Sequence, residues 1–110
     1  MENKILTLMG FASKAGKLSY GFDASIISAK SRKAKLIVVS EEISPKSKKE
    51  MQFYSQKNNI DFILLEGMDI QTVSQAVGHK CGIVSVNDKG FADAILKCYK
   101  TDCHTQKEDM

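Results

Sequence analysis

Three short runs of aliphatic and β-branched residues, each separated from the next by one helical pattern, constrain the fold of this chain most. The runs are Lys35–Ser40, Asp61–Glu66 and Ile83–Val86, and their apolar residues occupy consecutive positions. Such runs are typical of strands that are covered on both faces, as in parallel α/β sheets. We therefore expect an α/β fold, a three-layer sandwich in which helices cover both faces of one sheet.

Capping and turn residues place the remaining elements around these strands. A helix typically begins at a serine followed by proline, or at an aspartate before an apolar helical stripe. A glycine directly after such a stripe typically marks the end of the helix. They predict a short extended piece at Leu18–Tyr20, a helix over Phe22–Ser31, and further helices that follow Ser44, Asp69 and Asp88.

The length of 110 residues allows one domain, which we assign to residues 1–100. After Lys100 the apolar pattern is lost, and residues 101–110 are expected to form a disordered tail. No apolar run is long enough to cross a bilayer, and no cleavage site of a signal peptide follows the N-terminus. Three cysteines without regular spacing fit a reducing compartment, so we expect a monomeric cytoplasmic protein without membrane partners.

Positive charge is concentrated in the first half of the chain. Between Lys14 and Lys35 there are six basic residues and one acid, Asp23, whereas the last ten residues are acidic. A basic segment of this kind suggests a polyanionic partner. An ordinary solvated lysine surface explains the charge equally simply, and charge alone favours that interpretation.

Motifs for nucleotide binding are absent from the sequence. Gly10 and Gly16-Lys17 resemble a phosphate-binding loop, but five residues separate the glycines instead of four, and Leu18 stands where serine or threonine is required. The sequence also lacks the glycine pattern of dinucleotide-binding folds.

Candidate metal and catalytic groups are equally incomplete. Cys98, Cys103 and His104 lack a fourth ligand at workable spacing, and Cys98 falls on an apolar helical stripe. His79 and Cys81 are only two residues apart, with no acid nearby to orient a base. Paired carboxylates follow a strand at Glu41 and Glu42, where capping or solvated charge is the simpler role. We expect no enzyme, no metal site and no cofactor.

Four segments resemble a known family when they are taken together. They are Lys14–Asp23, Lys33–Glu42, Gln75–Gly78 and Val86–Leu96. In this combination the chain resembles the ribosomal protein L-seven-Ae and L-thirty-e superfamily, in particular its small bacterial YlxQ-like branch, from about Ile5 to Leu96. The resemblance implies an α/β/α sandwich around a mixed four-stranded sheet. It also implies binding of structured RNA, typically a kink-turn, by a ribosomal or ribosome-associated protein.

The implied RNA site combines the helix that follows Gly21 with nearby basic residues and a second loop. Gly21 lets the backbone approach a ligand, and the helix after it offers free N–H groups and a positive dipole end. Aromatic rings beside the glycine can stack on splayed bases, although packing on the core explains them about as well, and the aspartate is more simply a helix cap. The residues implied in RNA binding are Lys14, Lys17, Tyr20, Gly21, Phe22, Asp23, Lys30, His79, Lys80, Cys81 and Gly82.

Three residues depart from the pattern of the strongest kink-turn binders, which have asparagine and glutamate after the glycine and lysine one turn later. Here the positions hold Asp23, Ala24 and Ile27. An alternative hypothesis is therefore a protein–protein interaction module with reduced RNA binding, which predicts an exposed apolar patch around Phe22 and Ile27. A detached accessory domain of an RNA methyltransferase is a third, weaker alternative.

Overall fold

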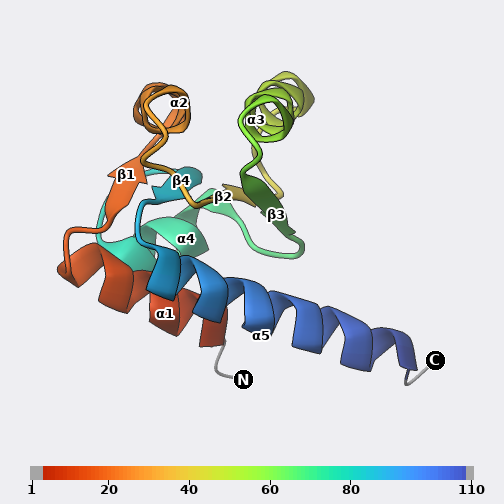
Figure 1. Ribbon diagram of the computed structural model, residues 1–110. Coiled ribbons are helices and arrows are strands. Elements are labelled where there is room, and N and C mark those ends of the chain that lie inside the picture. The colour runs from red at the N-terminus through yellow and green to blue at the C-terminus, as the bar shows by residue number, and fades with distance from the viewer. Residues whose placement is uncertain (1–3, 109–110) are drawn as a thin grey trace.

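The protein is a three-layer α/β/α sandwich (Figure 1). A computed structural model describes the backbone of residues 4–108 and the side chains of residues 4–100. Helix α5 continues to Glu108, and residues 109–110 lie outside the described residues. Because the side chains beyond residue 100 are not described either, the disordered tail expected at residues 101–110 stays a prediction. The elements are α1 (Lys4–Lys14), β1 (Leu18–Tyr20), α2 (Phe22–Lys30), β2 (Leu36–Ser40), α3 (Pro45–Lys57), β3 (Asp61–Leu65), α4 (Ile70–Val77), β4 (Ile83–Val86) and α5 (Lys89–Glu108).

The sheet is mixed and has the strand order β1-β4-β2-β3. Strand β4 runs antiparallel to both β1 and β2, and β3 pairs with β2 in parallel. Strands β1, β2 and β3 therefore all end at one end of the sheet, where β4 begins. We call this the carboxyl end and the other the amino end. The mixed four-stranded sheet that the resemblance implied is confirmed.

Strand β3 is less buried than its sequence suggested. It lies at the edge of the sheet, and Asp61 is exposed while Phe62 and Leu64 are only half-buried. Every residue of β2, in contrast, is buried. An apolar run alone does not distinguish an edge strand from a central one, because strand order depends on contacts far apart in the sequence.

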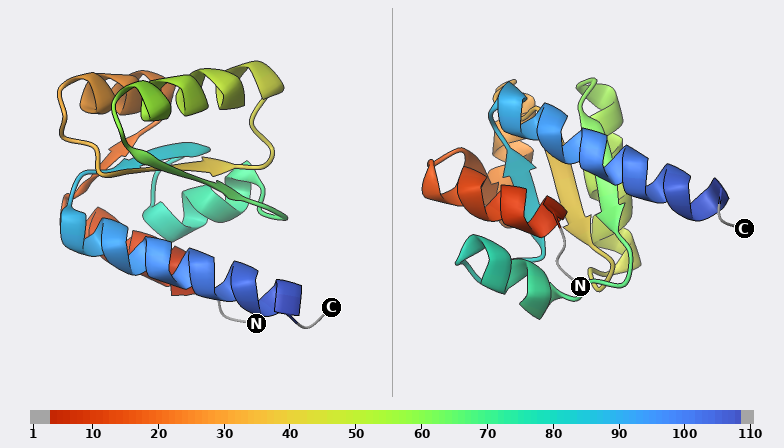
Figure 2. Two further views of the ribbon diagram at one scale, coloured as in Figure 1. Left: turned by 45° about the vertical axis from the view of Figure 1, so that its right-hand side comes forward. Right: turned by 90° about the horizontal axis from the view of Figure 1, so that it is seen from below.

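Helices α2 and α3 cover one face of the sheet, and α1, α4 and α5 cover the other (Figures 1 and 2). Two hydrophobic clusters result, because successive residues of a strand point to opposite faces. Leu36 and Val38 belong to the cluster under α1, α4 and α5, whereas Ile37 and Val39 pack under α2 and α3.

The capping residues of α3 and α4 occur where the sequence predicted them. The Ser44 hydroxyl accepts a hydrogen bond from the N–H of Ser47, and Pro45 opens α3. The Asp69 carboxylate accepts one from the N–H of Thr72 at 2.8 Å, and Gly78 ends α4 with a φ of 78°. Among the described residues, no helix has the length and hydropathy needed to span a membrane.

Candidate functional site

Two segments that are distant in the sequence meet at the carboxyl end of the sheet. The N–H of Gly21 donates to the carbonyl of Ile83 at 2.8 Å, which fixes the start of α2 beside the loop that precedes β4. The ring of His79 in that loop stacks on Tyr20, with 3.8 Å between centroids and 19° between planes. The two halves of the site implied by the sequence resemblance thus form one surface.

The turn at Gly21 requires glycine for its backbone conformation. Its φ is 92° and its ψ 173°, a region that residues with a side chain rarely adopt. A Cβ added there would meet no atom within 4 Å, so the turn faces open space. No side chain caps the start of α2, and Asp23 is exposed rather than acting as the cap we expected. The first N–H groups of α2 therefore face outward as hydrogen-bond donors.

The two aromatic residues beside the glycine are each partly packed and partly accessible. Phe22 is half-buried against the cluster under α2 and α3. Tyr20 packs against the other cluster, and its hydroxyl lies 2.6 Å from the Oγ of Ser13, which donates to the carbonyl of Val77. Because His79 covers one face of the Tyr20 ring, Phe22 is the better placed of the two to stack on a ligand.

The loop from His79 to Gly82 divides into an exposed half and a structural half. His79 and Lys80 are exposed, whereas Cys81 is buried and burial raises the pKa of its thiol above 9.0. The N–H of Cys81 donates to the Ser74 hydroxyl at 2.9 Å, and that hydroxyl donates back to the Cys81 carbonyl. A Cβ at Gly82 would lie 2.5 Å from the Cδ1 of Ile43. Cys81 and Gly82 thus set the shape of the loop, and His79 and Lys80 form its surface.

Three lysines of the implied site do not lie beside Gly21. Lys17 precedes β1 at the amino end of the sheet, where its carbonyl accepts from the N–H of Asn87 at 2.8 Å. Lys30 ends α2, and its ammonium group lies 5.3 Å from the ring centroid of Tyr54. Lys14 ends α1 in the opposite layer, beside a cavity of about 440 Å³ between α1 and α4.

Other charged residues occupy the carboxyl end instead, and they are not among the residues that the sequence predicted for the site. Helix α3 follows β2 and so begins at this end, which brings Lys46, Lys48 and Lys49 there. Glu41 and Glu42 also follow β2, and Glu42 accepts a hydrogen bond from the N–H of Ile70 at the start of α4. With Asp23 and Lys80, these residues give a surface of balanced charge. The sequence signal that could have placed these lysines at the carboxyl end is the proline after Ser44, because it marks a helix that begins directly after a strand.

The described residues contain no group of three His, Cys, Asp or Glu side chains arranged to hold a metal ion. What the carboxyl end does offer is a row of backbone donors, one accessible aromatic ring and flanking cations. The class of protein that the fold and this surface define is an α/β/α sandwich whose candidate site combines backbone donors and an aromatic ring with balanced charge.

The chain belongs to the ribosomal protein L7Ae/L30e/S12e/Gadd45 family, whose sequence profile matches residues 3–96. It is 28% identical over 91 residues to the RNA-binding protein YlxQ of Enterococcus faecium, covering 83% of this chain and 86% of that protein. It is 29% identical over 96 residues to the large ribosomal subunit protein eL30 of Candida glabrata, covering 86% and 90%. These relatives bear the names of RNA-binding and ribosomal proteins, in agreement with the prediction of a non-catalytic protein.

Solved structures share the same fold at low sequence identity. A protein of unknown function from Bacillus halodurans C superposes with a TM-score of 0.83 at 22% identity, over 88% of this chain and 97% of that one. The 15.5kD RNA binding protein of Giardia lamblia superposes with a TM-score of 0.74 at 8% identity, over 92% and 89%. The predicted family and fold class are thus confirmed.

Proposed function

We propose that this protein binds structured RNA through the carboxyl end of its sheet, as a non-catalytic ribosomal or ribosome-associated protein. Membership of the family and the names of the relatives support RNA binding of the ribosomal type. We propose further that it acts as a monomer in the cytoplasm. The observation that carries the proposal is the bond between Gly21 and Ile83, because it joins the start of α2 to the loop of His79.

Each part of the carboxyl end has a role that fits folded RNA. The outward N–H groups of α2 suit phosphate oxygens or base-edge acceptors. Phe22 can stack on an unpaired base, an interaction typically worth about 1–3 kcal/mol. Lys80 and the lysines that open α3 suit the flanking phosphates, which position the protein rather than specify a sequence. Specificity for RNA commonly comes from such splayed bases and from non-Watson–Crick edges.

A kink-turn is the RNA motif we propose first, with recognition altered by three side chains. Asp23 is exposed and, when ionised, can only accept hydrogen bonds. Ala24 has no polar group to reach a base, and Ile27 provides no cation. Recognition then rests on the backbone of the α2 start and on Phe22, so we expect weaker binding than a site with asparagine, glutamate and lysine at these positions would give.

Fluorescence anisotropy with a labelled kink-turn RNA tests this proposal. We expect the kink-turn to bind more tightly than a plain duplex of equal length at both low and high salt. Phe22→Ala should weaken binding about 5- to 150-fold, the range of one lost stack. Lys97→Ala, which removes an exposed cation from α5, is the matched control and should change little. Equal affinity for kink-turn and duplex would refute kink-turn recognition.

One observation favours a second function, a protein–protein interaction module on the same scaffold. Ile27 is 66% exposed on α2, at a position where an RNA-binding role would favour a cation. Phe22, however, is half-buried, so the apolar patch expected around both residues is reduced mainly to Ile27. Ile27→Lys distinguishes the two functions: it should strengthen RNA binding if α2 faces RNA, and should abolish recovery of a protein partner if α2 faces protein.

A further inference from the structure

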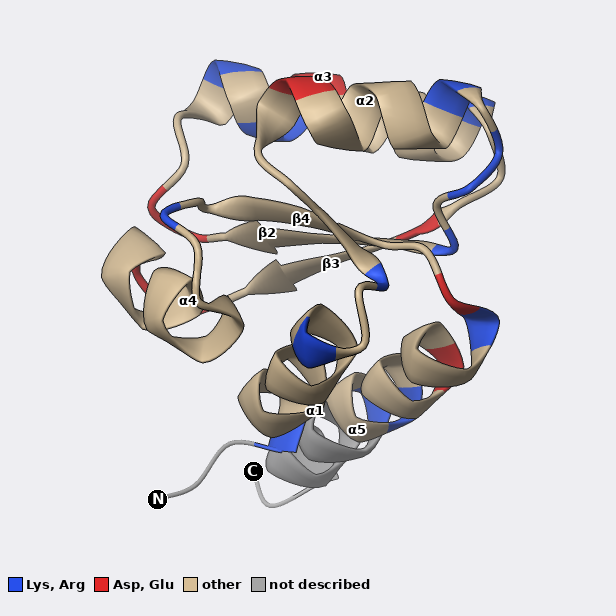
Figure 3. Ribbon diagram, turned by 90° about the vertical axis from the view of Figure 1, so that its left-hand side faces the viewer, with Lys and Arg blue, Asp and Glu red and all other residues tan. Residues whose placement is uncertain are grey.

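The amino end of the sheet carries more basic residues than the carboxyl end. Figure 3 shows the blue segments of the turn that leads from α2 into β2, at the end of the helix layer opposite the start of α2. Few exposed acidic residues lie at this end, and Asp61 at the start of β3 is one of them. The basic residues gathered at this end are Lys17, Lys30, Arg32, Lys33, Lys35, Lys57 and Lys89.

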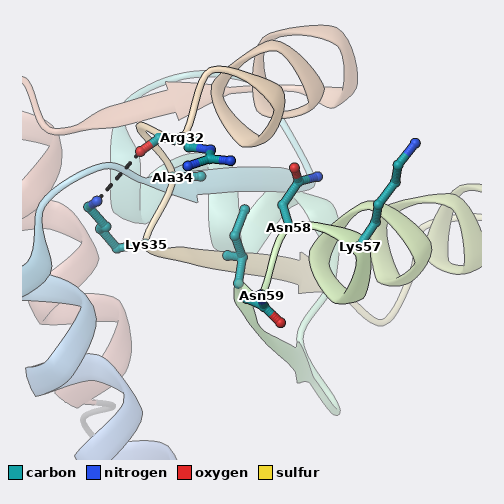
Figure 4. A pocket seen from close by; sticks show the side chains of 7 residues that line it. Arg32, Ala34, Lys35, Lys57, Asn58 and Asn59 are labelled. Atoms are coloured by element: carbon teal, nitrogen blue, oxygen red, sulfur yellow. Dashed lines mark hydrogen bonds between the residues drawn. The ribbon is translucent and has the colours of Figure 1, made fainter.

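A cavity of about 360 Å³ opens between the two turns at this end (Figure 4). Its walls come from the turn between α2 and β2 and from the turn between α3 and β3. None of its lining residues is acidic, so the cavity presents cations and amides to a ligand. The lining residues are Arg32, Ala34, Lys35, Lys57, Asn58, Asn59 and Ile60. We call this cavity the amino-end groove.

The two turns have the same backbone design. After α2, the N–H of Arg32 donates to the Ala29 carbonyl and that of Lys33 to the Ser28 carbonyl, at 3.2 and 3.0 Å. After α3, Asn59 and Ile60 repeat this pattern, with their N–H groups bound to carbonyls three and five residues earlier. This is the Schellman motif, in which the residue after the cap adopts a left-handed conformation and is usually glycine.

Arginine is an unusual choice for that left-handed position. Arg32 has a φ of 65°, and Asn59 a φ of 56°. Asparagine tolerates this region, whereas a long side chain without local hydrogen bonding is disfavoured there. Stability of the turn alone would favour glycine at residue 32. Figure 4 shows the guanidinium group of Arg32 extending into the space toward the amide of Asn58. The long side chain thus stands at a position that its backbone conformation does not favour.

Stabilisation of helix ends explains only part of the charge. Cations near a helix C-terminus interact favourably with the helix dipole, which accounts for Lys30 and Lys57 without any ligand. It does not account for Lys35, which lies beyond the helix and directs its ammonium group toward the carbonyl of Arg32 at 3.5 Å. Stabilisation of the helix end does not require arginine in a left-handed position either, because the Schellman hydrogen bonds already satisfy the carbonyls of the last turn.

Groups suited to a nucleobase lie beside the cations. The Phe53 side chain is 57% exposed one turn before Lys57, whose ammonium group lies 5.9 Å from the ring centroid. Asn58 donates through Nδ2 to the carbonyl of Tyr54 at 2.8 Å, which holds its amide at the wall of the groove. Asparagine amides both donate and accept hydrogen bonds, as base edges do. Exposed aromatic rings beside cationic groups are the combination that single-stranded nucleic acids bind.

From this arrangement we propose that the amino-end groove is a second RNA-binding site, which takes a single-stranded segment. Arg32 and Lys57 contact its phosphates, Asn58 or Asn59 contacts a base edge, and Phe53 stacks on a neighbouring base. The site is separate from the carboxyl end and does not depend on recognition of a kink-turn there.

Anisotropy with a fluorescein-labelled oligouridine of about 12 nucleotides tests this proposal, because that RNA forms no kink-turn. We expect Arg32→Gly/Lys57→Ala to weaken binding and to lower the slope of log affinity against log salt by about 1.4, or roughly 0.7 for each lost contact with a single strand. Lys97→Ala/Lys100→Ala, which removes two exposed cations from α5 outside both sites, is the matched control and should leave the affinity for oligouridine and its salt slope unchanged.

The choice of glycine at position 32 keeps the test informative about folding. Arg32→Gly should leave the thermal unfolding midpoint unchanged or raise it, because glycine adopts positive φ without steric cost. Loss of affinity at undiminished stability then reports the binding site. Oligouridine binding that is insensitive to Arg32→Gly/Lys57→Ala, or equal competition by a duplex or by inorganic phosphate at matched ionic strength, would overturn the proposal. Neither result depends on whether the carboxyl end binds a kink-turn.

Discussion

Asn87 is a hydrogen-bonding centre between three elements, and replacing it with alanine should destabilise the fold strongly. Its Oδ1 accepts from the hydroxyls of Ser28 on α2 and Ser85 on β4, at 2.6 and 2.7 Å. Its Nδ2 donates to the Oγ of Ser19 on β1 at 2.9 Å. One amide therefore holds α2 against the two strands of the sheet nearest to it.

The expected magnitude follows from the burial of the partners. Ser28 is 3% exposed and Ser85 is fully buried, so water does not readily replace the lost acceptor. A buried polar group left without a partner costs about 1–3 kcal/mol, whereas Ser19 is half-buried and can reach solvent. Asn87→Ala should thus lower the free energy of unfolding by about 3 kcal/mol. At a urea dependence of about 2 kcal/mol per molar, the midpoint falls by about 1.5 M.

A second variant separates the hydrogen-bond network from simple loss of packing. In the background Ser28→Ala/Ser85→Ala, the two buried hydroxyls no longer need an acceptor, so Asn87→Ala should cost clearly less there. The difference between the two backgrounds is the coupling energy of a mutant cycle, and urea unfolding followed by circular dichroism measures it. A cost of Asn87→Ala below about 0.5 kcal/mol, or one that is the same in both backgrounds, would refute this reasoning.

Three further changes test the site and its surroundings. Gly21→Ala forces a side chain into a glycine conformation and should cost about 1–3 kcal/mol in urea unfolding, although no atom blocks the new methyl group. Because burial raises its pKa, Cys81 should be alkylated by iodoacetamide at pH 8 more slowly than the half-buried Cys98, and mass spectrometry should show the difference disappear in denaturant. Hydrogen bonds from the side chain and backbone of Thr72 lower the pKa of Asp69 below 3.8, so the charged form of Asp69 stabilises the fold above that pH. Asp69→Asn should therefore melt at a lower temperature than the wild-type protein, with the largest difference at neutral pH. The difference should disappear as the pH falls through the lowered pKa.

Local signals in the sequence predicted the elements well but not their neighbours in space. Caps such as Asp69 and Gly78 act within one helical turn, so the sequence alone places them correctly. Strand order depends on pairings across many residues, and the edge position of β3 was missed for that reason. The stacking of His79 on Tyr20 joins residues far apart in the chain, and no local pattern reports such a contact.

The basic residues show why proximity in sequence is a poor guide to the site. Lys17 is close to Gly21 along the chain, but the three-residue strand between them separates the two residues by about 13 Å at 3.3 Å per residue. Lys30 lies at the far end of α2, about 13 Å from the glycine at 1.5 Å per residue. Lys46 is more distant in sequence, yet α3 begins at the same end of the sheet as α2. The direction of each element, rather than its position in the chain, decides which cations share a surface.

Helix α2 therefore connects two surfaces that should contribute differently to RNA affinity. Its start offers backbone donors and Phe22 among balanced charges, which favours recognition of shape with little release of counterions. Its end leads into a groove whose ionisable lining groups are all cationic, Arg32, Lys35 and Lys57, and phosphate contacts of that kind determine salt dependence. With an RNA that joins a kink-turn to a single-stranded extension, Phe22→Ala should reduce the preference for the kink-turn and leave the salt slope nearly unchanged. Arg32→Gly should lower the slope and keep that preference. If both variants changed slope and preference together, the two surfaces would form one site, and the division along α2 would be wrong.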